Sequence, residues 1–501
     1  MGEKFETLQA RLTDLASLGQ AIAVLDWDHQ VNMPPGGVQA RAAQVSLLAR
    51  LQHEMATSDE MGRLLEAAES EMAGIDYDSD AAGLLRAARF DYDQETRFPT
   101  AFVEQMSRLT TEAHEIWAKA RANKDFASFA PTLEKLMELA RQGAEYLGYE
   151  DHPYDALLNR YERGMTAARV KEIFDGHKPQ LVELIAAIGE VEGRVSDALL
   201  HQNFEVDRQR EFSLWAARAI GYDFTRGRLD VAVHPFCTSF SRGDVRMTTR
   251  YYDDFFNPAF FGVLHEAGHG LYEQGIGEGI ASTILGSGTS LGVHESQSRM
   301  WENIVGRSRE FWQFALPKAK ELFPAQFGNA SVEDIFKAAN RVERQFIRVE
   351  ADEATYNLHI MLRFEIEVGL LEGSIRVADL PQVWNARFEE YLGLTPPDDA
   401  EGVLQDVHWS AGLIGYFPTY ALGNLLSVQY FNKALEQHPN LRAEFAQGKF
   451  DTLLNWLITN IHQHGRKFTS EELTQRITGT GIDSAPYIRY LQGKFKDVYG
   501  L

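Results

Sequence analysis

The sequence is poor in cysteine and in positive charge. It has one cysteine, Cys237, in 501 residues, which excludes an internal disulfide framework and a metal site built from cysteines. The 49 Lys and Arg residues face 72 Asp and Glu residues, and the net charge of −23 argues against nucleic acid or an anionic membrane as partner. The 40 glycines and 16 prolines are too few for a fibrous or low-complexity chain. We therefore expect a soluble globular protein of the reducing cytoplasm.

Long hydrophobic runs are also scarce. Residues 1–19 mix acidic and basic side chains with apolar ones, so we expect no export signal there. Residues 409–431 carry no charge and are long enough to span a bilayer. They contain Pro418, Asn424 and Gln429, however, and such interruptions favour a segment buried inside the protein over a membrane helix.

Apolar residues that recur at spacings of three and four predict a mostly helical protein. The pattern is clearest over residues 5–24, 39–55, 102–121, 130–147 and 167–195. A small antiparallel sheet is predicted for residues 229–233, 237–240 and 245–252, with a turn at residues 241–244. No repeat, linker or charge block marks a boundary. We expect one domain over residues 1–501, with a helical lid region at residues 1–120.

A helix start and a metal-binding pattern follow the predicted sheet. Asn257 is a suitable N-cap and Pro258 suits the first helical position. His265 and His269 then lie one turn apart on one face, a separation that a single Zn²⁺ can bridge. Glu266, one step round the helix, can reach a water at the ion without binding the ion itself. This is the H-E-x-x-H pattern of zinc metallopeptidases.

A catalytic zinc ion needs a third protein ligand and one open position. Glu295 opens the next helical pattern, after a glycine-rich connection that can return antiparallel, and we favour it. His294 and Glu302 are alternatives, and the helix dipole alone could explain a carboxylate at position 295. Two imidazoles and one carboxylate suit Zn²⁺, and the same ligands accept Co²⁺ or Mn²⁺.

These groups predict hydrolysis of an amide bond. The ion would acidify a water and polarise a carbonyl, while Glu266 would take the proton of the attacking water. The oxyanion that forms needs a further donor, typically a tyrosine or histidine. The sequence around the motif does not choose among the candidates.

Several further motifs resemble the M32 family of metallocarboxypeptidases, the thermostable carboxypeptidase group. They are His-Pro-Phe at residues 234–236, D-x-R-x-T at 244–248, H-E-S-Q at 294–297, I-R-x-x-A-D at 347–352 and G-x-x-Q-D-x-H-W at 402–409, together with residues 25–28, 33–34 and 154–166. The motifs stand in the family's order, and the resemblance covers essentially the whole chain.

The resemblance implies a mainly α, two-lobed helical metallopeptidase fold with a deep groove, like neurolysin and the angiotensin-converting enzymes. It implies a homodimer with His265, His269 and Glu295 as metal ligands and Glu266 as general base. The implied activity is release of single C-terminal amino acids from peptides, with broad side-chain tolerance.

The resemblance also implies substrate-binding residues. Arg246 and Arg348 match positions proposed to hold the terminal carboxylate, a task that suits a bidentate guanidinium. Taken alone, each arginine is better explained as an ordinary surface ion pair, because most arginines are solvated or paired. Gln405, Asp406 and His408 match a motif that lines the site, and the last two could instead be a hydrogen-bonded pair that orients a ligand.

Contacts to the oxyanion and the substrate are assigned to three further residues. We predict His234 and Tyr420 as catalytic, with Tyr420 preferred over Tyr416, which is assigned to substrate binding. The strand at residues 245–252 is interpreted as an edge strand that aligns the peptide by main-chain hydrogen bonds.

Three functions fit these observations. We favour a metal-dependent carboxypeptidase acting on peptides with a free C-terminal carboxylate. An endo-oligopeptidase with the same metal centre and an open-ended groove is the alternative. A metal-stabilised helical scaffold that only binds peptides is the third, and Glu266 argues against it because a scaffold needs the histidines but not the base.

Overall fold

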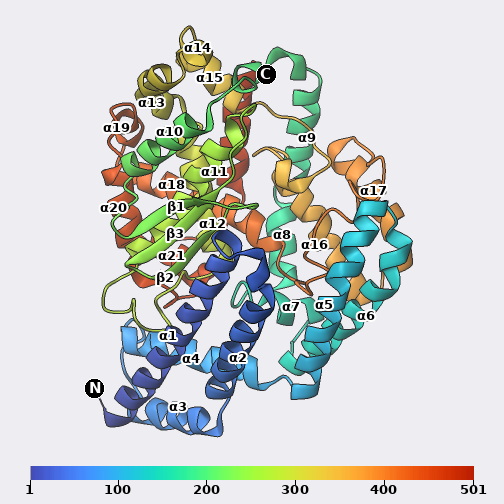
Figure 1. Cartoon of the computed structure of the whole chain (residues 1–501), viewed down its shortest axis with the longest axis vertical. Helices are drawn as coiled ribbons and strands as arrows, with labels where there is room; N and C mark the ends of the chain where they lie inside the picture. Colours follow the sequence, from blue (N-terminus) through green and yellow to red (C-terminus); the bar gives the residue numbers. More distant parts are fainter. Residues whose placement is uncertain (1) are drawn as a thin grey trace. The chain divides into compact units, whose positions relative to one another are not determined.

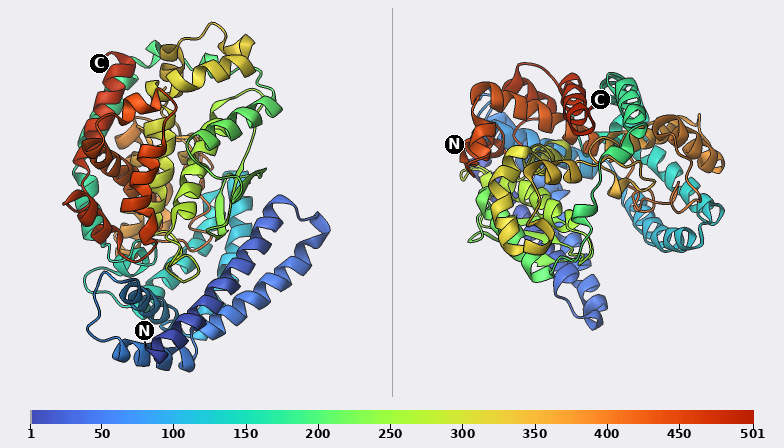
Figure 2. Two further views of the ribbon diagram at one scale, coloured as in Figure 1. Left: turned by 90° about the vertical axis from the view of Figure 1, so that its left-hand side faces the viewer. Right: turned by 90° about the horizontal axis from the view of Figure 1, so that it is seen from above.

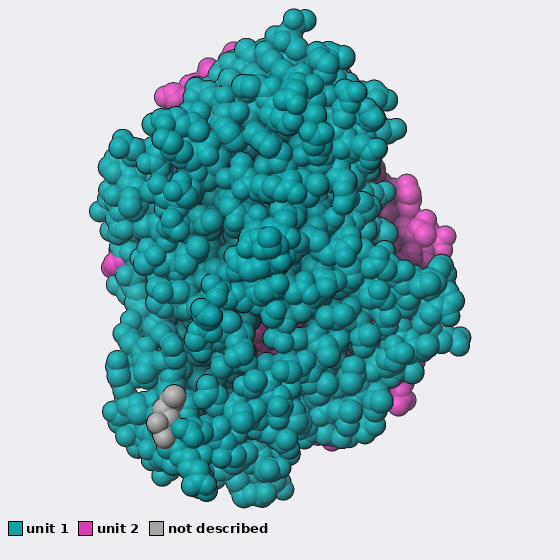
Figure 3. All heavy atoms as spheres, turned by 60° about the vertical axis from the view of Figure 1, so that its left-hand side comes forward, with its two compact units in different colours: residues 1–96, 197–339, 430–478 teal, residues 97–196, 340–429, 479–501 magenta. Residues whose placement is uncertain are grey.

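The computed structural model describes residues 2–501, and the chain divides into two compact units, coloured teal and magenta in Figure 3. Unit 1 comprises Met1–Thr96, Asp197–Ala339 and Tyr430–Thr478; unit 2 comprises Arg97–Ser196, Asn340–Gln429 and Gly479–Leu501. Each unit is assembled from three separate stretches of chain. The single domain and the lid region at residues 1–120 stay predictions, and the first boundary between units falls inside that region.

Unit 1 holds the sheet and most of the helices (Figure 1). Its elements are α1 (Glu3–Val31), α2 (Val38–Ala56), α3 (Asp59–Glu71), α4 (Asp80–Thr96), α10 (Val206–Ala219), β1 (Gly227–Val231), β2 (Cys237–Ser241), β3 (Asp244–Thr249), α11 (Asn257–Gly275), α12 (Leu291–Arg299), a π-helical segment (Met300–Gly306), α13 (Arg309–Leu322), α14 (Pro324–Phe327), α15 (Val332–Ala339), α19 (Leu441–Phe445), α20 (Asp451–Asn460) and α21 (Ser470–Thr478).

Unit 2 is built from helices and their connections. These are α5 (Thr100–Asn123), α6 (Phe126–Leu147), α7 (Pro153–Leu158), α8 (Ala167–Asp175), α9 (Lys178–Gly189), α16 (Tyr356–Glu372), α17 (Leu380–Leu392) and α22 (Ala485–Tyr499). Helix α18 (Pro418–Gln437) carries the chain from unit 2 into unit 1. The mostly helical prediction is therefore confirmed.

The helical pattern at residues 167–195 contains a break. The pattern at residues 167–195 divides into α8 and α9, which are separated by Gly176 and His177. Pro179 lies in the first turn of α9, where its fixed φ and missing N–H are tolerated; inside a continuous helix it would remove a hydrogen bond. The apolar period alone did not reveal this break.

Helices α1 and α2 form a long antiparallel hairpin (Figure 2). Arg41 of α2 links the two helices, because Arg41 Nη2 donates to Asp28 Oδ2 of α1 at 2.6 Å. The predicted apolar stripe of α1 is buried with residues of α3, α4 and the loop after α11; this core includes Phe5, Leu8, Leu12, Leu15, Met61, Leu65, Leu84, Ile276, Ile280 and Leu285. The hairpin is thus anchored by the first half of α1.

The small sheet is mixed: the predicted antiparallel pairing is confirmed for β2 and β3 but is wrong for β1. The strand order is β1-β3-β2, with β1 parallel and β2 antiparallel to β3. Residues 232–236 carry the chain past the end of β3, where Ala232 N donates to Thr249 O and Thr248 N donates to Phe236 O. β1 and β2 are consecutive in sequence but do not pair, because they lie on opposite sides of β3. They are an exception to the tendency of consecutive strands to be neighbours.

The strand order also removes the proposed peptide-aligning edge. Strand β3 pairs on both sides, so its main-chain groups are occupied by β1 and β2. The interpretation of residues 245–252 as an edge strand is therefore wrong. The sheet instead packs against α11, the helix that carries the H-E-x-x-H motif (Figure 1).

The uncharged stretch at residues 409–431 lies inside the protein, as predicted. Most of its apolar residues are buried, and Leu422, Leu425 and Leu426 are fully buried. Among residues 2–501, no helix combines the length and the apolar character that a membrane span requires.

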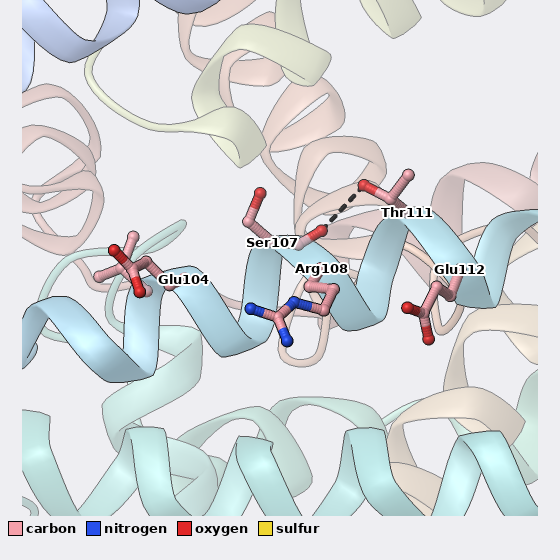
Figure 4. Close-up of a pocket in the computed structure, with 6 residues that line it drawn as sticks. Glu104, Ser107, Arg108, Thr111 and Glu112 are labelled. Carbon is pink, nitrogen blue, oxygen red and sulfur yellow. Dashed lines mark hydrogen bonds between the residues drawn. The ribbon is translucent and has the colours of Figure 1, made fainter.

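A surface hollow of unit 2 runs along α5 and is formed by that helix alone. It is lined by Val103, Glu104, Ser107, Arg108, Thr111 and Glu112. Figure 4 shows Glu104, Arg108 and Glu112 at four-residue steps, and Thr111 Oγ1 donates to Ser107 O at 2.8 Å. Opposite charges at this spacing are typical of a solvated helix face, and we assign no chemistry to the hollow.

Candidate metal centre

Helix α11 is anchored by aromatic side chains at its start. Asn257 is its first residue and Phe256 precedes it without a side-chain cap, so Asn257 is not the N-cap that the sequence suggested. Phe256 and Phe260 stack with ring centroids 5.2 Å apart, and Phe212 of α10 stacks on Phe260 at 4.9 Å. This aromatic packing fixes the helix that presents His265 and His269.

A glycine lets α12 approach α11 at the level of these histidines. A Cβ atom on Gly268 would lie 2.6 Å from both Gln297 O and Ser298 Cα, which is closer than real Cβ contacts allow. Because the obstructing atoms belong to the backbone of α12, only glycine permits the two helices to pack this closely. The packing brings Glu295 next to the histidines.

Three side chains converge at this point. Glu295 Oε2 lies 3.7 Å from His265 Nε2 and 3.6 Å from His269 Nε2. Ligands of a tetrahedral ion at 2.0–2.1 Å lie about 3.3 Å from one another, so a small contraction would complete the coordination. Among residues 2–501, these three side chains form the group of His, Cys, Asp or Glu residues whose ligand atoms are close enough to hold one metal ion. The predicted ligand set fits a divalent ion.

Glu266 is buried beside the candidate ligands but is not one of them. Burial raises the pKa of its carboxyl to about 7, Glu295 and Glu302 contribute in the same direction, and His265 opposes the shift. A carboxylate with a pKa near neutrality is well suited to take up a proton. The position of Glu266 is therefore compatible with the predicted role of general base.

Glu295 is held by a neighbouring arginine. Arg299 Nε donates to Glu295 Oε1 at 2.6 Å, which leaves Oε2 facing the histidines. Burial alone would raise the pKa of Glu295, but the charges of Arg299 and His265 keep it well below its usual value. The carboxylate is ionised and oriented as a metal ligand must be.

Glu302, one of the alternative ligands, supports His265 from behind. Its Oε2 lies 3.0 Å from His265 Nδ1, and Arg307 Nη2 donates to its Oε1 at 3.0 Å. Glu302 belongs to the π-helical segment that follows α12, a backbone form that is frequent at functional sites. A carboxylate on the Nδ1 side fixes the ring so that Nε2 faces the ion.

His294, the other alternative, also lies behind a ligand. Its Nδ1 is 2.6 Å from His269 Nδ1, while His269 Nε2 faces Glu295. It is therefore outside the group of candidate ligands.

The second group of predicted residues gathers in unit 2 around a buried ion-pair cluster. Asp406 Oδ1 accepts from Arg348 Nη2 at 2.8 Å, and Asp406 Oδ2 accepts from Arg363 Nε at 2.6 Å. Arg348 also donates to the Tyr356 hydroxyl at 2.7 Å. Burial alone would raise the pKa of Asp406, but the two arginines hold it far below its usual value. Arg348 is thus a buried residue and not a surface ion pair.

Gln405 clamps the backbone that carries Arg348. Its Oε1 accepts from Arg348 N at 2.8 Å, and its Nε2 donates to the carbonyls of Phe346 and Glu401, each at 2.9 Å. These contacts give Gln405 a positioning task within unit 2.

His408, Tyr416 and Tyr420 lie together in unit 2. His408 Nε2 is 3.3 Å from the Tyr420 hydroxyl, and the Tyr416 ring lies 5.3 Å from that of Tyr420. Burial lowers the pKa of His408 to about 4, so it is neutral. Gly415, just before Tyr416, has φ +89, and a Cβ at this position would lie 2.8 Å from Leu158 N. Both the backbone conformation and the close contact therefore require glycine here.

His234 and Arg246 belong to unit 1. His234 is exposed in the connection between β1 and β2. Arg246, on β3, makes two bonds to Asp244, of 2.8 and 2.7 Å, and its guanidinium lies 4.2 Å from the Trp27 ring centroid. Since Arg246 and Arg348 lie in different units, their joint grip on one carboxylate stays a prediction.

Three residues around these sites were not predicted from the sequence. Glu273 follows His269 by four residues on α11 and hydrogen-bonds His294. The four-residue spacing of positions 265, 269 and 273 places all three on one helix face and could have indicated Glu273. Arg299 lies one turn beyond Glu295. Arg363 is fully buried in the apolar helix α16, and an arginine in such a helix indicates a buried partner.

A mainly helical fold that joins two histidines of one helix with a glutamate of the next is typical of a metallopeptidase. The model of the family described as Carboxypeptidase Taq (M32) metallopeptidase matches residues 7–495. The chain belongs to this family, which confirms the resemblance found in the sequence.

Relatives and solved structures agree along the whole chain. It is 42% identical to thermostable carboxypeptidase 1 of Thermus thermophilus, covering 97% of this chain and 96% of the relative. It is 37% identical to carboxypeptidase 1 of Bacillus subtilis, with 97% of each covered. The crystal structure of an M32 carboxypeptidase from Deinococcus radiodurans R1 matches with a TM-score of 0.96 at 41% identity, over 100% of both chains.

We expect Gly268→Ala to lower the free energy of unfolding by about 1–3 kcal/mol, because the methyl group must push α11 and α12 apart. Metal binding should weaken with it. Gly262→Ala on the same helix is the control, since its Cβ would meet only Thr249 Oγ1, at 3.7 Å. Urea unfolding of both variants measures the difference. Equal stability of the two variants would contradict the close packing at Gly268.

Proposed function

We propose that this protein is a metal-dependent carboxypeptidase that releases single amino acids from the C-termini of peptides. The observation that carries the proposal is the convergence of His265, His269 and Glu295, with the buried Glu266 beside them. The names of the relatives, thermostable carboxypeptidase 1 and carboxypeptidase 1, support it.

Each residue has a task in the proposed reaction. His265 and His269, through Nε2, and Glu295, through Oε2, would hold one divalent ion, proposed to be Zn²⁺, with Co²⁺ or Mn²⁺ also compatible. When bound there, the ion would supply Lewis acidity to a water and to the scissile carbonyl. Glu266 accepts the proton of the attacking water and passes it to the leaving amine, as a buried carboxyl with a pKa near 7 is suited to do.

Recognition of the C-terminus is proposed for the arginines. Arg246 keeps a fixed orientation through Asp244 and the Trp27 ring, and Arg348 through Asp406 and Tyr356. A guanidinium held in this way can bind a carboxylate with little loss of side-chain entropy. Tyr420 and His234 remain proposed as oxyanion donors, Tyr416 and His408 as substrate contacts. Broad specificity, a homodimer and a cytoplasmic location remain predictions.

A pair of peptides tests the proposed activity. We expect stepwise release of free amino acids from a peptide with a free C-terminus, and a loss of at least about 10²-fold in kcat/KM when the terminus is amidated. Mass spectrometry of timed samples distinguishes the products. Internal cleavage of the amidated peptide at a similar rate would favour the endo-oligopeptidase, and binding without cleavage would favour the scaffold.

A further inference from the structure

The second imidazole of the metal centre is connected to a buried carboxylate through another histidine. His269 Nδ1 lies 2.6 Å from His294 Nδ1, and His294 Nε2 lies 2.8 Å from Glu273 Oε1. The chain begins at the ring nitrogen opposite Nε2, the His269 atom that faces Glu295. It therefore leaves the ligand atom of His269 available to an ion.

The proton positions in this chain have one consistent arrangement. When Nε2 of His269 binds an ion, its Nδ1 carries the proton and must donate it. His294 Nδ1 then accepts, so His294 carries its own proton on Nε2 and donates to Glu273. In the opposite arrangement, His294 would carry its proton on Nδ1 and donate it to His269, so that its Nε2 would be unprotonated. Nε2 and the Glu273 carboxylate would then both be acceptors, and no hydrogen bond could form between them.

The surroundings hold the His294 ring in this orientation. A Cβ on Gly288 would lie 2.6 Å from His294 Cδ2, so glycine makes room for the ring. The Tyr272 ring lies 5.1 Å from that of His294, and the Tyr272 hydroxyl accepts from Thr289 N at 2.9 Å. Glu273 is only 7% exposed. The connection is therefore part of the packed structure around α11 and α12.

The two ligating histidines have different supports. His265 contacts the carboxylate of Glu302 directly, and Arg299 and Arg307 share that carboxylate. His269 reaches Glu273 only through His294. An imidazole in the intermediate position offers a single acceptor atom and therefore fixes both the tautomer and the ring direction of His269.

We propose that His294 is the positioning residue of the metal ligand His269, and that Glu273 holds His294 in the tautomer this requires. The proposal rests on the proposed function, since it presupposes an ion at His265, His269 and Glu295. It gives His294 and Glu273 a role in metal affinity, in place of the ligand role that the sequence left open for His294.

Two substitutions of similar size separate positioning from simple packing. In His294→Asn the amide oxygen takes about the place of Nδ1, so an acceptor for His269 is kept. In His294→Gln the amide takes about the place of Nε2, so contact with Glu273 is kept and the acceptor is lost. Competition with a chromophoric chelator measures zinc affinity. We expect His294→Gln to bind zinc about 10–100-fold more weakly than the parent, and His294→Asn to stay within about fivefold.

A spectroscopic signature and a control complete the test. In the Co²⁺-substituted protein, the exchangeable Nδ1–H resonances of both ligating imidazoles are shifted by the ion, and we expect one of them to exchange rapidly with water in His294→Gln. His177→Asn is the control, because His177 is a buried histidine of unit 2 whose Nδ1 bonds Ile173 O; zinc affinity should not change. If His294→Gln does not fold, Glu273→Met replaces it, with an expected loss of about tenfold.

The outcomes distinguish this inference from the proposed function. Parent-like zinc affinity in His294→Gln, or an equal loss in the Asn and Gln variants, overturns the positioning role while the metal centre stands. A parent protein that binds no zinc overturns the proposed function as well.

Discussion

Glu266→Gln is expected to reduce kcat for peptide hydrolysis by about 10²–10⁴-fold while one metal ion per chain is retained. The amide has almost the size of the carboxyl but cannot take up a proton. Glu266 is 6% exposed and lies outside the ligand group, so its loss should change the chemistry and leave the metal site intact. Steady-state kinetics with a free C-terminal peptide and metal analysis of the same sample measure both quantities.

Glu278→Gln is the matched control for this variant. Its side chain is 94% exposed, in the loop that follows α11, so activity should equal that of the parent. A metal-loaded Glu266→Gln protein with more than about a tenth of the parent activity would show that another group takes the proton.

Asp406→Asn is expected to lower the free energy of unfolding by about 3–5 kcal/mol. Asp406 bonds two buried arginines, Arg348 and Arg363, whose side chains are 6% and 0% exposed. Without the negative charge, two guanidinium groups would share a site of low dielectric constant with no countercharge from residue 406. The substitution should also loosen Arg348 and so weaken discrimination of a free C-terminus.

Asp379→Asn provides the comparison, because it too breaks an Asp–Arg pair in unit 2. Arg376 binds Asp379 with bonds of 2.7 and 2.8 Å, but the arginine is 77% exposed. An exposed pair of this kind contributes little to stability, because water screens the two charges. Urea denaturation of both variants measures the two losses. If they are similar, the cluster around Asp406 is not the buried ion-pair network described above.

The sequence singled out the candidate metal-binding group because helical geometry determines where two of its members lie. A spacing of four residues places His265 and His269 on one face of α11 whatever the rest of the fold does. Sequence spacing favoured Glu295 but left His294 and Glu302 open, because the choice depends on side-chain direction in α12 and on the π-helical segment after it. All three proved to contact the histidines, two of them on the Nδ1 side.

The sheet and the buried cluster depended on contacts distant in sequence. Strand character was visible within residues 229–252, but pairing of β1 with β3 depends on where residues 232–236 cross. Arg348 fitted a surface ion pair until Arg363 and Asp406, both remote in the chain, were found beside it. Local patterns predict which elements form, and they carry little information about which buried charges meet.

Metal titration of the purified protein tests the central claim most directly. Chelator-treated protein should be inactive toward a peptide with a free C-terminus, and Zn²⁺ should restore activity linearly up to about one equivalent per chain, with a matching rise in Tm. This result would tie activity to a single ion at the His265, His269 and Glu295 site. Full activity in protein that contains less than about a tenth of an equivalent of metal would contradict the account.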